Sequence, residues 1–168
     1  MTEDELVKKT LETSKTIAMV GVSSIKKEIS TNIRRRPSII VMKYMQEFGY
    51  RVIPVNPFSA GGKIHGEIIV AKLNDIKIPV DIVDVFRPSK EAPVIAEDAV
   101  KIGAKVFWLQ YGIQNDDAKK IVELKNIFYV SNKCIKQEYQ KLFLKVSPVF
   151  PALKNWWTVS SVGRADDS

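Results

Sequence analysis

The sequence is poor in the residues that build covalent cross-links and metal sites. Its 168 residues include one cysteine, Cys134, and one histidine, His65. A single cysteine excludes a disulfide within the chain, and one cysteine with one histidine cannot supply the usual ligands of a zinc site. A disulfide-stapled fold and a structural zinc protein are therefore excluded, and no metal ligands are assigned.

Long apolar runs are missing as well. The best candidate, residues 78–86, is interrupted by Pro79, Asp81 and Asp84 and is far shorter than the roughly 18 residues of a membrane span. The acidic first residues lack the basic-then-apolar layout of a signal peptide. With 45% hydrophobic and 27% charged residues, the composition is globular. We expect a cytoplasmic protein that does not contact membranes.

What is present is a repeated alternation of short apolar runs and amphipathic segments. Helical spacing predicts helices that begin near Thr2, Pro37, Ser89 and Asn115. Apolar runs predict strands at 16–21, 50–55, 80–86, 105–109 and 127–130. This alternation predicts an α/β fold, a doubly wound and mainly parallel sheet of about five strands with helices on both faces.

The domain organisation is expected to be simple. Residues 1–145 carry the whole alternation and are predicted to form one domain. Residues 146–168 form a C-terminal extension whose last part is small and polar, and we expect it to be partly mobile.

Positive charge gathers in one short segment. The chain has 26 Lys+Arg against 19 Asp+Glu, a net charge of +7, and residues 26–36 include Lys26, Lys27 and three consecutive arginines. This segment precedes a predicted helix N-terminus, and in doubly wound sheets ligands bind beyond the carboxyl ends of the strands. A small polyanionic ligand is therefore favoured over a solvated basic loop. Nucleic acid is disfavoured, because no predicted helix has a basic face.

The glycine fingerprint of dinucleotide-binding folds is absent after the first predicted strand. Only Gly21 is present, and the second strand ends in Asn56, not in the acid that binds the ribose hydroxyls of NAD. A neutral side chain near a basic segment tolerates a phosphorylated ribose better than an acid would. The residues thus point to a nucleotide with more phosphate than NAD, and both NADP and coenzyme A (CoA) qualify.

Six stretches, taken together and in this order, resemble the CoA-binding domain family. Its members include stand-alone Rossmann-like proteins similar to the CoA-binding domain of succinyl-CoA synthetase. The resemblance covers residues 12 to about 137 and implies a Rossmann-like fold with CoA or acyl-CoA as the cofactor. The stretches are Val20–Ser23, Arg36–Ser38, Gly49–Pro57, Val80–Arg87, Gly103–Gln110 with Gly112, and Lys133–Cys134.

The resemblance also implies which residues surround the cofactor. The turn under the pyrophosphate would consist of Gly21, Val22, Ser23 and Ser24, and the phosphate contacts would come from Arg35, Arg36, Pro37 and Ser38. The adenosine would lie between Asn56 and Pro57, and the cofactor would be covered by Phe86 and Arg87. Its far side would be lined by Gln110 and Gly112, and Lys133 belongs to the same set of cofactor-binding residues. Asn132 replaces an acid that the family often has, which puts a role for position 132 in doubt.

The expected function is non-catalytic binding of CoA or acyl-CoA by a single domain, as a regulatory or carrier module. The alternative is an NADP-dependent oxidoreductase. No catalytic residues are assigned, because His65 has no partner acid at a fixed spacing. Cys134 is expected to be a buried small side chain instead of a reactive thiol, and Asp84 to bond a loop amide. No protein partner is identified.

Overall fold

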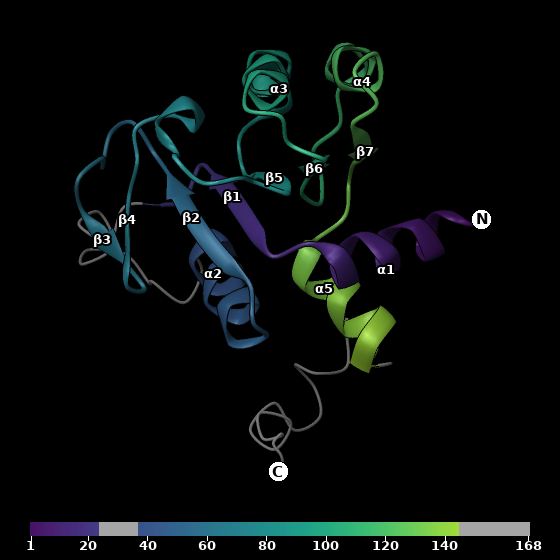
Figure 1. The fold of residues 1–168 in the computed structure, drawn as a ribbon, viewed down its shortest axis with the longest axis horizontal. Helices are drawn as coiled ribbons and strands as arrows, with labels where there is room; N and C mark the ends of the chain where they lie inside the picture. Colours follow the sequence, from purple (N-terminus) through teal and green to yellow (C-terminus); the bar gives the residue numbers. More distant parts are fainter. Residues whose placement is uncertain (24–36, 145–168) are drawn as a thin grey trace.

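The structure, a computed structural model, describes residues 1–23 and 37–144 of the chain (Figure 1). Three of the residues expected to bind the cofactor, Ser24, Arg35 and Arg36, lie outside these ranges. So does the C-terminal extension expected over residues 146–168. The predictions for these segments therefore stay predictions.

A single parallel five-stranded sheet forms the centre of the molecule. Its strand order is β2-β1-β5-β6-β7. The strands are β1 (Thr16–Val20), β2 (Arg51–Val55), β5 (Ile82–Val85), β6 (Val106–Leu109) and β7 (Phe128–Val130). The chain passes from β1 outward to β2 and then returns to the other side of β1 for β5. The strand order therefore reverses between β1 and β5, where doubly wound folds bind ligands.

Helices cover both faces of this sheet (Figure 1). One face carries α1 (Glu3–Thr13), α2 (Pro37–Glu47) and α5 (Ile135–Tyr139), which continues into a π-helical turn. The other carries α3 (Ala92–Lys101) and α4 (Asp116–Glu123). The α/β, Rossmann-like doubly wound prediction is confirmed.

Each face of the sheet has its own hydrophobic core, because strand side chains alternate between the faces. Trp108 is fully buried on the α1/α2/α5 face, and Phe107 is fully buried on the α3/α4 face. Both aromatic side chains, which the apolar run at 105–109 predicts to be core residues, do belong to the core. On β5, the same alternation directs Ile82 and Asp84 to the first face and Val83 and Val85 to the second.

Two helix N-caps and the proline in β2 agree with the local sequence. Thr2 and Glu5 form the reciprocal capping box of α1, and Asn115 caps α4 by accepting a hydrogen bond from the Ala118 N–H at 2.9 Å. Pro54 fits within β2 because β2 lies at the edge of the sheet, where a missing N–H donor is tolerated.

The sequence pattern also predicts Ser89 as a helix N-cap, residues 56–66 as a loop and residues 73–79 as a short helical turn, and the first two of these predictions are wrong. Ser89 does not cap a helix: a 3₁₀ turn, Ser89–Glu91, precedes α3, and the Ser89 hydroxyl accepts from the Gln114 N–H at 3.2 Å. The segment 56–66, expected to be a loop, contributes to a small antiparallel hairpin of β3 (Lys63–Ile64) and β4 (Glu67–Ile68). Strands of two residues are too short to show a periodic pattern. The remaining short element, a 3₁₀ turn at Leu73–Asp75, was expected as a helical turn.

No helix in the described ranges is both long enough and apolar enough to cross a bilayer. Within those ranges there is also no group of three His, Cys, Asp or Glu side chains that could hold a metal ion.

Candidate functional site

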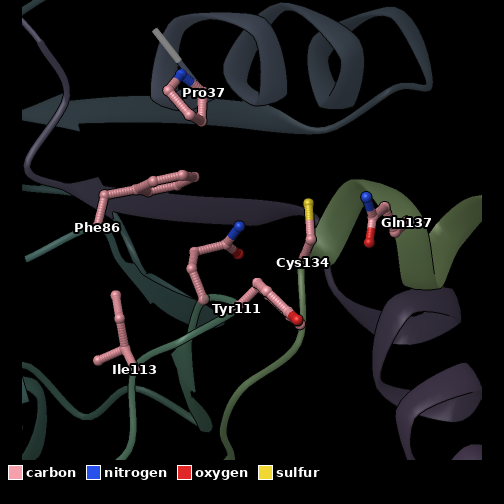
Figure 2. A pocket seen from close by; sticks show the side chains of 7 residues that line it. Pro37, Phe86, Tyr111, Ile113, Cys134 and Gln137 are labelled. Atoms are coloured by element: carbon pink, nitrogen blue, oxygen red, sulfur yellow. The ribbon is translucent and has the colours of Figure 1, made fainter. Parts of the chain in front are cut away.

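A cavity of about 570 Å³ opens beyond the carboxyl ends of β5 and β6, next to the point where the strand order reverses. This volume lies within the usual range for small-molecule sites. Figure 2 shows side chains from four parts of the fold converging on this space. The lining residues are Pro37 at the start of α2, Phe86 after β5, Gln110, Tyr111 and Ile113 after β6, and Cys134 and Gln137 at the start of α5.

Gly21 ends β1 at the reversal point and has no room for a side chain. Its φ of +94° is one that L side chains rarely adopt. A Cβ there would lie 2.7 Å from Cδ of Arg87 and 2.9 Å from the carbonyl oxygen of Phe86. The glycine thus lets the turn after β1 approach the segment after β5, which contributes Phe86 to the cavity.

The turn after β1 is tied to the loop after β2 by Asn56. The Asn56 amide Nδ2 donates to the carbonyl of Val22 at 2.7 Å, and its Oδ1 accepts from the Phe58 N–H at 2.8 Å. Both ends of the side chain are therefore engaged within the protein, while Pro57 beside it is exposed. Asn56 fixes the shape of this edge of the site, which the sequence could not show.

Ser38 ties the start of α2 to the same turn. Its side chain is buried, and its hydroxyl oxygen accepts from the Ser23 N–H at 3.1 Å. Pro37, the first residue of α2, lines the cavity. The N-terminus of an eleven-residue helix therefore lies at the cavity, where its backbone N–H groups favour an anion.

Two cations expected at the cofactor are each paired with a carboxylate. Arg87 donates to Glu91 through Nε at 3.0 Å and through Nη2 at 2.8 Å, and these hydrogen bonds raise the pKa of Arg87. Lys133 places its Nζ 3.8 Å from a carboxylate oxygen of Glu3 on α1. Any contact of either cation with a ligand must therefore compete with an internal ion pair.

Gln110 connects the end of β6 to the start of α5. It is only 5% exposed, and its Oε1 accepts from the Ile135 N–H at 3.2 Å. Its side chain also hydrogen-bonds Cys134. Gln110 therefore holds the first turn of α5, and Cys134 with it, against the cavity.

Gly112 allows the loop after β6 to adopt a backbone conformation with a positive φ. Its φ is +86°, and its N–H donates to Oδ1 of Asn132 at 2.7 Å. A Cβ there would meet no atom within 4 Å, so Gly112 is needed for its conformation and not for a close approach. The Asn132 contact gives position 132 a structural role that an aspartate oxygen could also fill.

Sequence reasoning misjudged two residues, one on the cavity wall and one buried on β5, two residues before Phe86. Cys134, expected to be a buried small side chain, is half-buried and lines the cavity. Asp84, expected to bond a loop amide, is fully buried, and neither of its oxygens has a hydrogen-bond partner among residues 1–23 and 37–144. Burial raises the pKa of Asp84 well above its ordinary value. A carboxylate within an apolar strand was the available signal, but its lack of a partner is visible only in three dimensions.

Comparison with known proteins gives the family. The family model described as "CoA binding domain" matches residues 15–140. The chain belongs to the CoA binding domain family. The resemblance inferred from the sequence motifs is thereby confirmed.

Individual relatives match most of the chain. "Uncharacterized protein YneT" of Bacillus subtilis (strain 168) is 38% identical over 130 residues, which span 77% of this chain and 89% of that protein. A solved structure of cell-free ID.343 from Thermus thermophilus has 34% identity and a TM-score of 0.76, covering 84% of this chain and 100% of that one. A hypothetical protein from Pyrococcus horikoshii OT3 has 34% identity and a TM-score of 0.73, covering 84% and 92%. The two solved structures therefore share the fold over most of this chain.

Proposed function

We propose that this protein binds coenzyme A or an acyl-CoA at the carboxyl edge of its sheet, as a single-domain regulatory or carrier module that does not turn the ligand over. The observation that carries the proposal is the coincidence of three features in a chain of this family. These are a glycine turn without room for a side chain, a helix N-terminus and a cavity, all at the reversal of strand order.

The parts of CoA fit the parts of this edge. The pyrophosphate would lie against the Gly21–Ser23 turn and the start of α2, where backbone N–H groups favour anions. The adenosine would lie toward the Asn56–Pro57 loop, and the pantetheine arm would enter the cavity beside Phe86 and Gln110. The basic residues 34–36, outside the described ranges, are expected to contact phosphate.

Binding without turnover is favoured by the chemistry of the cavity lining. The lining contributed by residues 1–23 and 37–144 offers amide, phenol, thiol and apolar groups but no histidine and no carboxylate. His65, the single histidine, lies on the β3–β4 hairpin turn, where its Nε2 is 3.3 Å from the carbonyl of Ile39. We therefore expect neither sustained thioester hydrolysis nor hydride transfer.

Calorimetric titration with CoA, acetyl-CoA, dephospho-CoA, NADPH and NAD tests the proposal. CoA should bind saturably, dephospho-CoA more weakly because it lacks the ribose phosphate, and NAD little or not at all. At a CoA concentration of 100 times Kd, the fold should gain about 2.7 kcal/mol. Binding of NADPH without binding of CoA or acetyl-CoA would overturn the proposal in favour of the oxidoreductase.

A further inference from the structure

Phe58, in the loop that follows β2, is the most exposed large hydrophobic residue among residues 1–23 and 37–144. It is 89% exposed. An exposed apolar residue is common on protein surfaces and is not by itself a site. What points to a ligand is the way the backbone holds this ring and the edge of the sheet at which it lies.

The loop that carries Phe58 is braced by hydrogen bonds. The Phe58 N–H donates to Oδ1 of Asn56 at 2.8 Å, and the Ser59 N–H donates to the Asn56 carbonyl at 3.2 Å. Farther along, the Gly61 N–H donates to the carbonyl of Ile69 at 2.8 Å. The exposed ring therefore stands on a backbone that is ordered before any ligand binds, which lowers the entropy cost of a contact with it.

The same loop is joined to the turn against which the pyrophosphate is proposed to lie. Asn56 donates through Nδ2 to the carbonyl of Val22 at 2.7 Å, and Val22 belongs to the turn after β1. In doubly wound folds, the side chain that follows the second strand contacts the ribose of the adenosine. Asn56 occupies that position here, so Phe58 lies two residues from the expected place of the ribose.

A second exposed aromatic residue lies at the same edge of the sheet. Tyr111, in the loop after β6, is 76% exposed and lines the cavity (Figure 2). Its loop is braced in a similar way: the Gly112 N–H donates to Oδ1 of Asn132 at 2.7 Å, and the Ile113 N–H donates to the Gln110 carbonyl at 2.9 Å. The two most exposed aromatic residues in the described part of the chain therefore both stand on braced loops at the carboxyl edge.

The present inference rests on the proposed function, because it names the part of CoA that Phe58 contacts. We propose that Phe58 is the base-stacking residue of the site, and that the face of its ring packs on the adenine of CoA or acyl-CoA. Every base presents a flat π face, and an aromatic side chain that stacks on it contributes to affinity. Phe58 thereby selects ligands that carry a nucleotide, independently of what is attached to the thiol.

A contact with another protein accounts for the exposed ring less well. A phenylalanine side chain buries about 150–250 Å², whereas a stable protein interface buries about 800 Å² on each partner. Within residues 51–70, all of which the structure describes, Ile68 is the only other exposed large hydrophobic residue. The loop and the hairpin beside it therefore offer too little apolar area for such an interface, whereas one ring is enough for one base.

Calorimetric titration of CoA into three variants tests the stacking. Phe58→Ala removes the ring, Phe58→Leu keeps an apolar side chain without a π face, and Phe58→Trp enlarges the face. The Kd of CoA should rise about fivefold or more in the alanine variant and nearly as much in the leucine variant, and stay within about twofold of the wild type in the tryptophan variant. Wild-type affinity in Phe58→Ala would overturn the inference, and so would full rescue by leucine.

Leu124 offers a matched control at the opposite edge of the sheet. It lies between α4 and β7 and is 81% exposed, so Leu124→Ala removes a similarly exposed apolar side chain and should leave the Kd of CoA unchanged. Without ligand, the melting temperature of each variant should stay within about 2 °C of the wild type, because the substituted side chains are exposed. A much larger fall in Phe58→Ala would show that the ring supports the loop, and would overturn the inference.

Phe58→Trp also reports the contact itself, because an indole that stacks on a base loses fluorescence. Addition of CoA should lower the fluorescence of this variant relative to that of the wild type, which has three tryptophans of its own. The decrease should saturate at the Kd measured by calorimetry. 4′-Phosphopantetheine, which has no base, should produce no such decrease. Unchanged fluorescence at saturating CoA, or an equal decrease with 4′-phosphopantetheine, would overturn the inference.

The same titrations separate this inference from the proposed function. Binding of CoA to the wild type with an unchanged Kd in Phe58→Ala would overturn the stacking and leave the proposed function standing. Absence of CoA binding to the wild type would overturn both. Loss of a dimer in Phe58→Ala with an unchanged Kd, measured by size-exclusion chromatography, would overturn the inference in favour of a contact between copies of this chain.

Discussion

The two ends of β5 carry the same side chain in opposite circumstances. At its amino end, Asp81 accepts from the Lys15 N–H at 2.8 Å and from the Thr16 N–H at 3.1 Å, and its other oxygen lies 3.4 Å from Nζ of Lys105. Three residues later, Asp84 is more deeply buried and has no hydrogen-bond partner among the described residues. The carboxylate of Asp81 thus has hydrogen-bond donors within the protein, whereas the carboxyl group of Asp84 has none among the described residues.

The two carboxyl groups therefore respond to pH in opposite directions. Partial burial alone would push the pKa of Asp81 up, but the hydrogen bonds from Lys15, Thr16 and Lys105 outweigh it and hold that pKa below its ordinary value. Burial raises the pKa of Asp84. This contrast supports the proposal that the ligand binds at the carboxyl edge of the sheet, whereas the aspartate at the amino edge stabilises the fold.

The largest loss of CoA affinity is expected from Gly21→Ala at the carboxyl edge, and Gly103→Ala at the amino edge is its control. Gly21→Ala should abolish measurable CoA binding, because a Cβ would strike the Phe86 carbonyl and the Arg87 side chain. Gly103, in the turn before β6 at the amino edge, has a similar positive φ of +73° but no atom near its missing Cβ. Gly103→Ala should cost only about 1–2 kcal/mol of stability from the strained backbone and leave the CoA Kd unchanged. Calorimetry and thermal melts measure both effects, and equal losses of affinity would break the comparison.

The next largest effect is the loss of stability expected when the Asp81 carboxylate is removed. Asp81→Ala should lower the free energy of unfolding by about 2 kcal/mol, because two backbone N–H groups lose a charged acceptor. Lys105→Ala is the matched control and should change stability by less than about 1 kcal/mol, since its ion pair is exposed to solvent. Urea unfolding measures both. A loss of CoA affinity in Asp81→Ala at a pH where it is folded would contradict a purely structural amino edge.

A smaller effect of opposite sign is expected at Asp84. Because its pKa is raised, its contribution to stability is fully present below the ordinary pKa near 3.8 and is lost as pH rises through the folded-state value. The contribution of Asp81, whose pKa is lowered, is instead present above the unfolded-state pKa and lost as pH falls. Asp84→Asn should therefore stabilise the protein by about 1 kcal/mol at neutral pH and abolish the loss of stability that the Asp84 carboxyl group causes as pH rises. Urea unfolding from pH 4 to 8 measures this, and a destabilised Asp84→Asn would mean that the carboxylate has a stabilising contact after all.

The smallest effect is expected at Asn132, where the family often has an acid. Its Oδ1 accepts from the Gly112 N–H, and an aspartate oxygen can do the same at the left-handed φ of +57°. Asn132→Asp should therefore change the melting temperature and the CoA Kd only slightly. A tenfold change in Kd, measured by calorimetry, would show that position 132 contacts the ligand directly.

Much of the fold could be predicted because the strands are short, apolar and separated by capped helices. The sequence also showed two departures from the dinucleotide fingerprint: Gly21 is the only glycine after β1, and Asn56, not an acid, follows β2. The ion pair of Arg87 with Glu91 was within reach as an i,i+4 spacing, but that of Lys133 with Glu3 joins opposite ends of the chain. The unpartnered state of Asp84 could not be read from sequence, because it depends on what every neighbouring strand and helix fails to offer.

The claim that the carboxyl edge is the CoA site is tested most directly by amide hydrogen exchange with and without CoA. The account predicts that CoA slows exchange in peptides covering residues 21–23, 110–113 and 134–137. Exchange should stay unchanged at residues 14–16 and 102–106, on the opposite edge of the same sheet. Protection at the amino edge, or saturable binding with no protection at residues 21–23 and 110–113, would contradict the account.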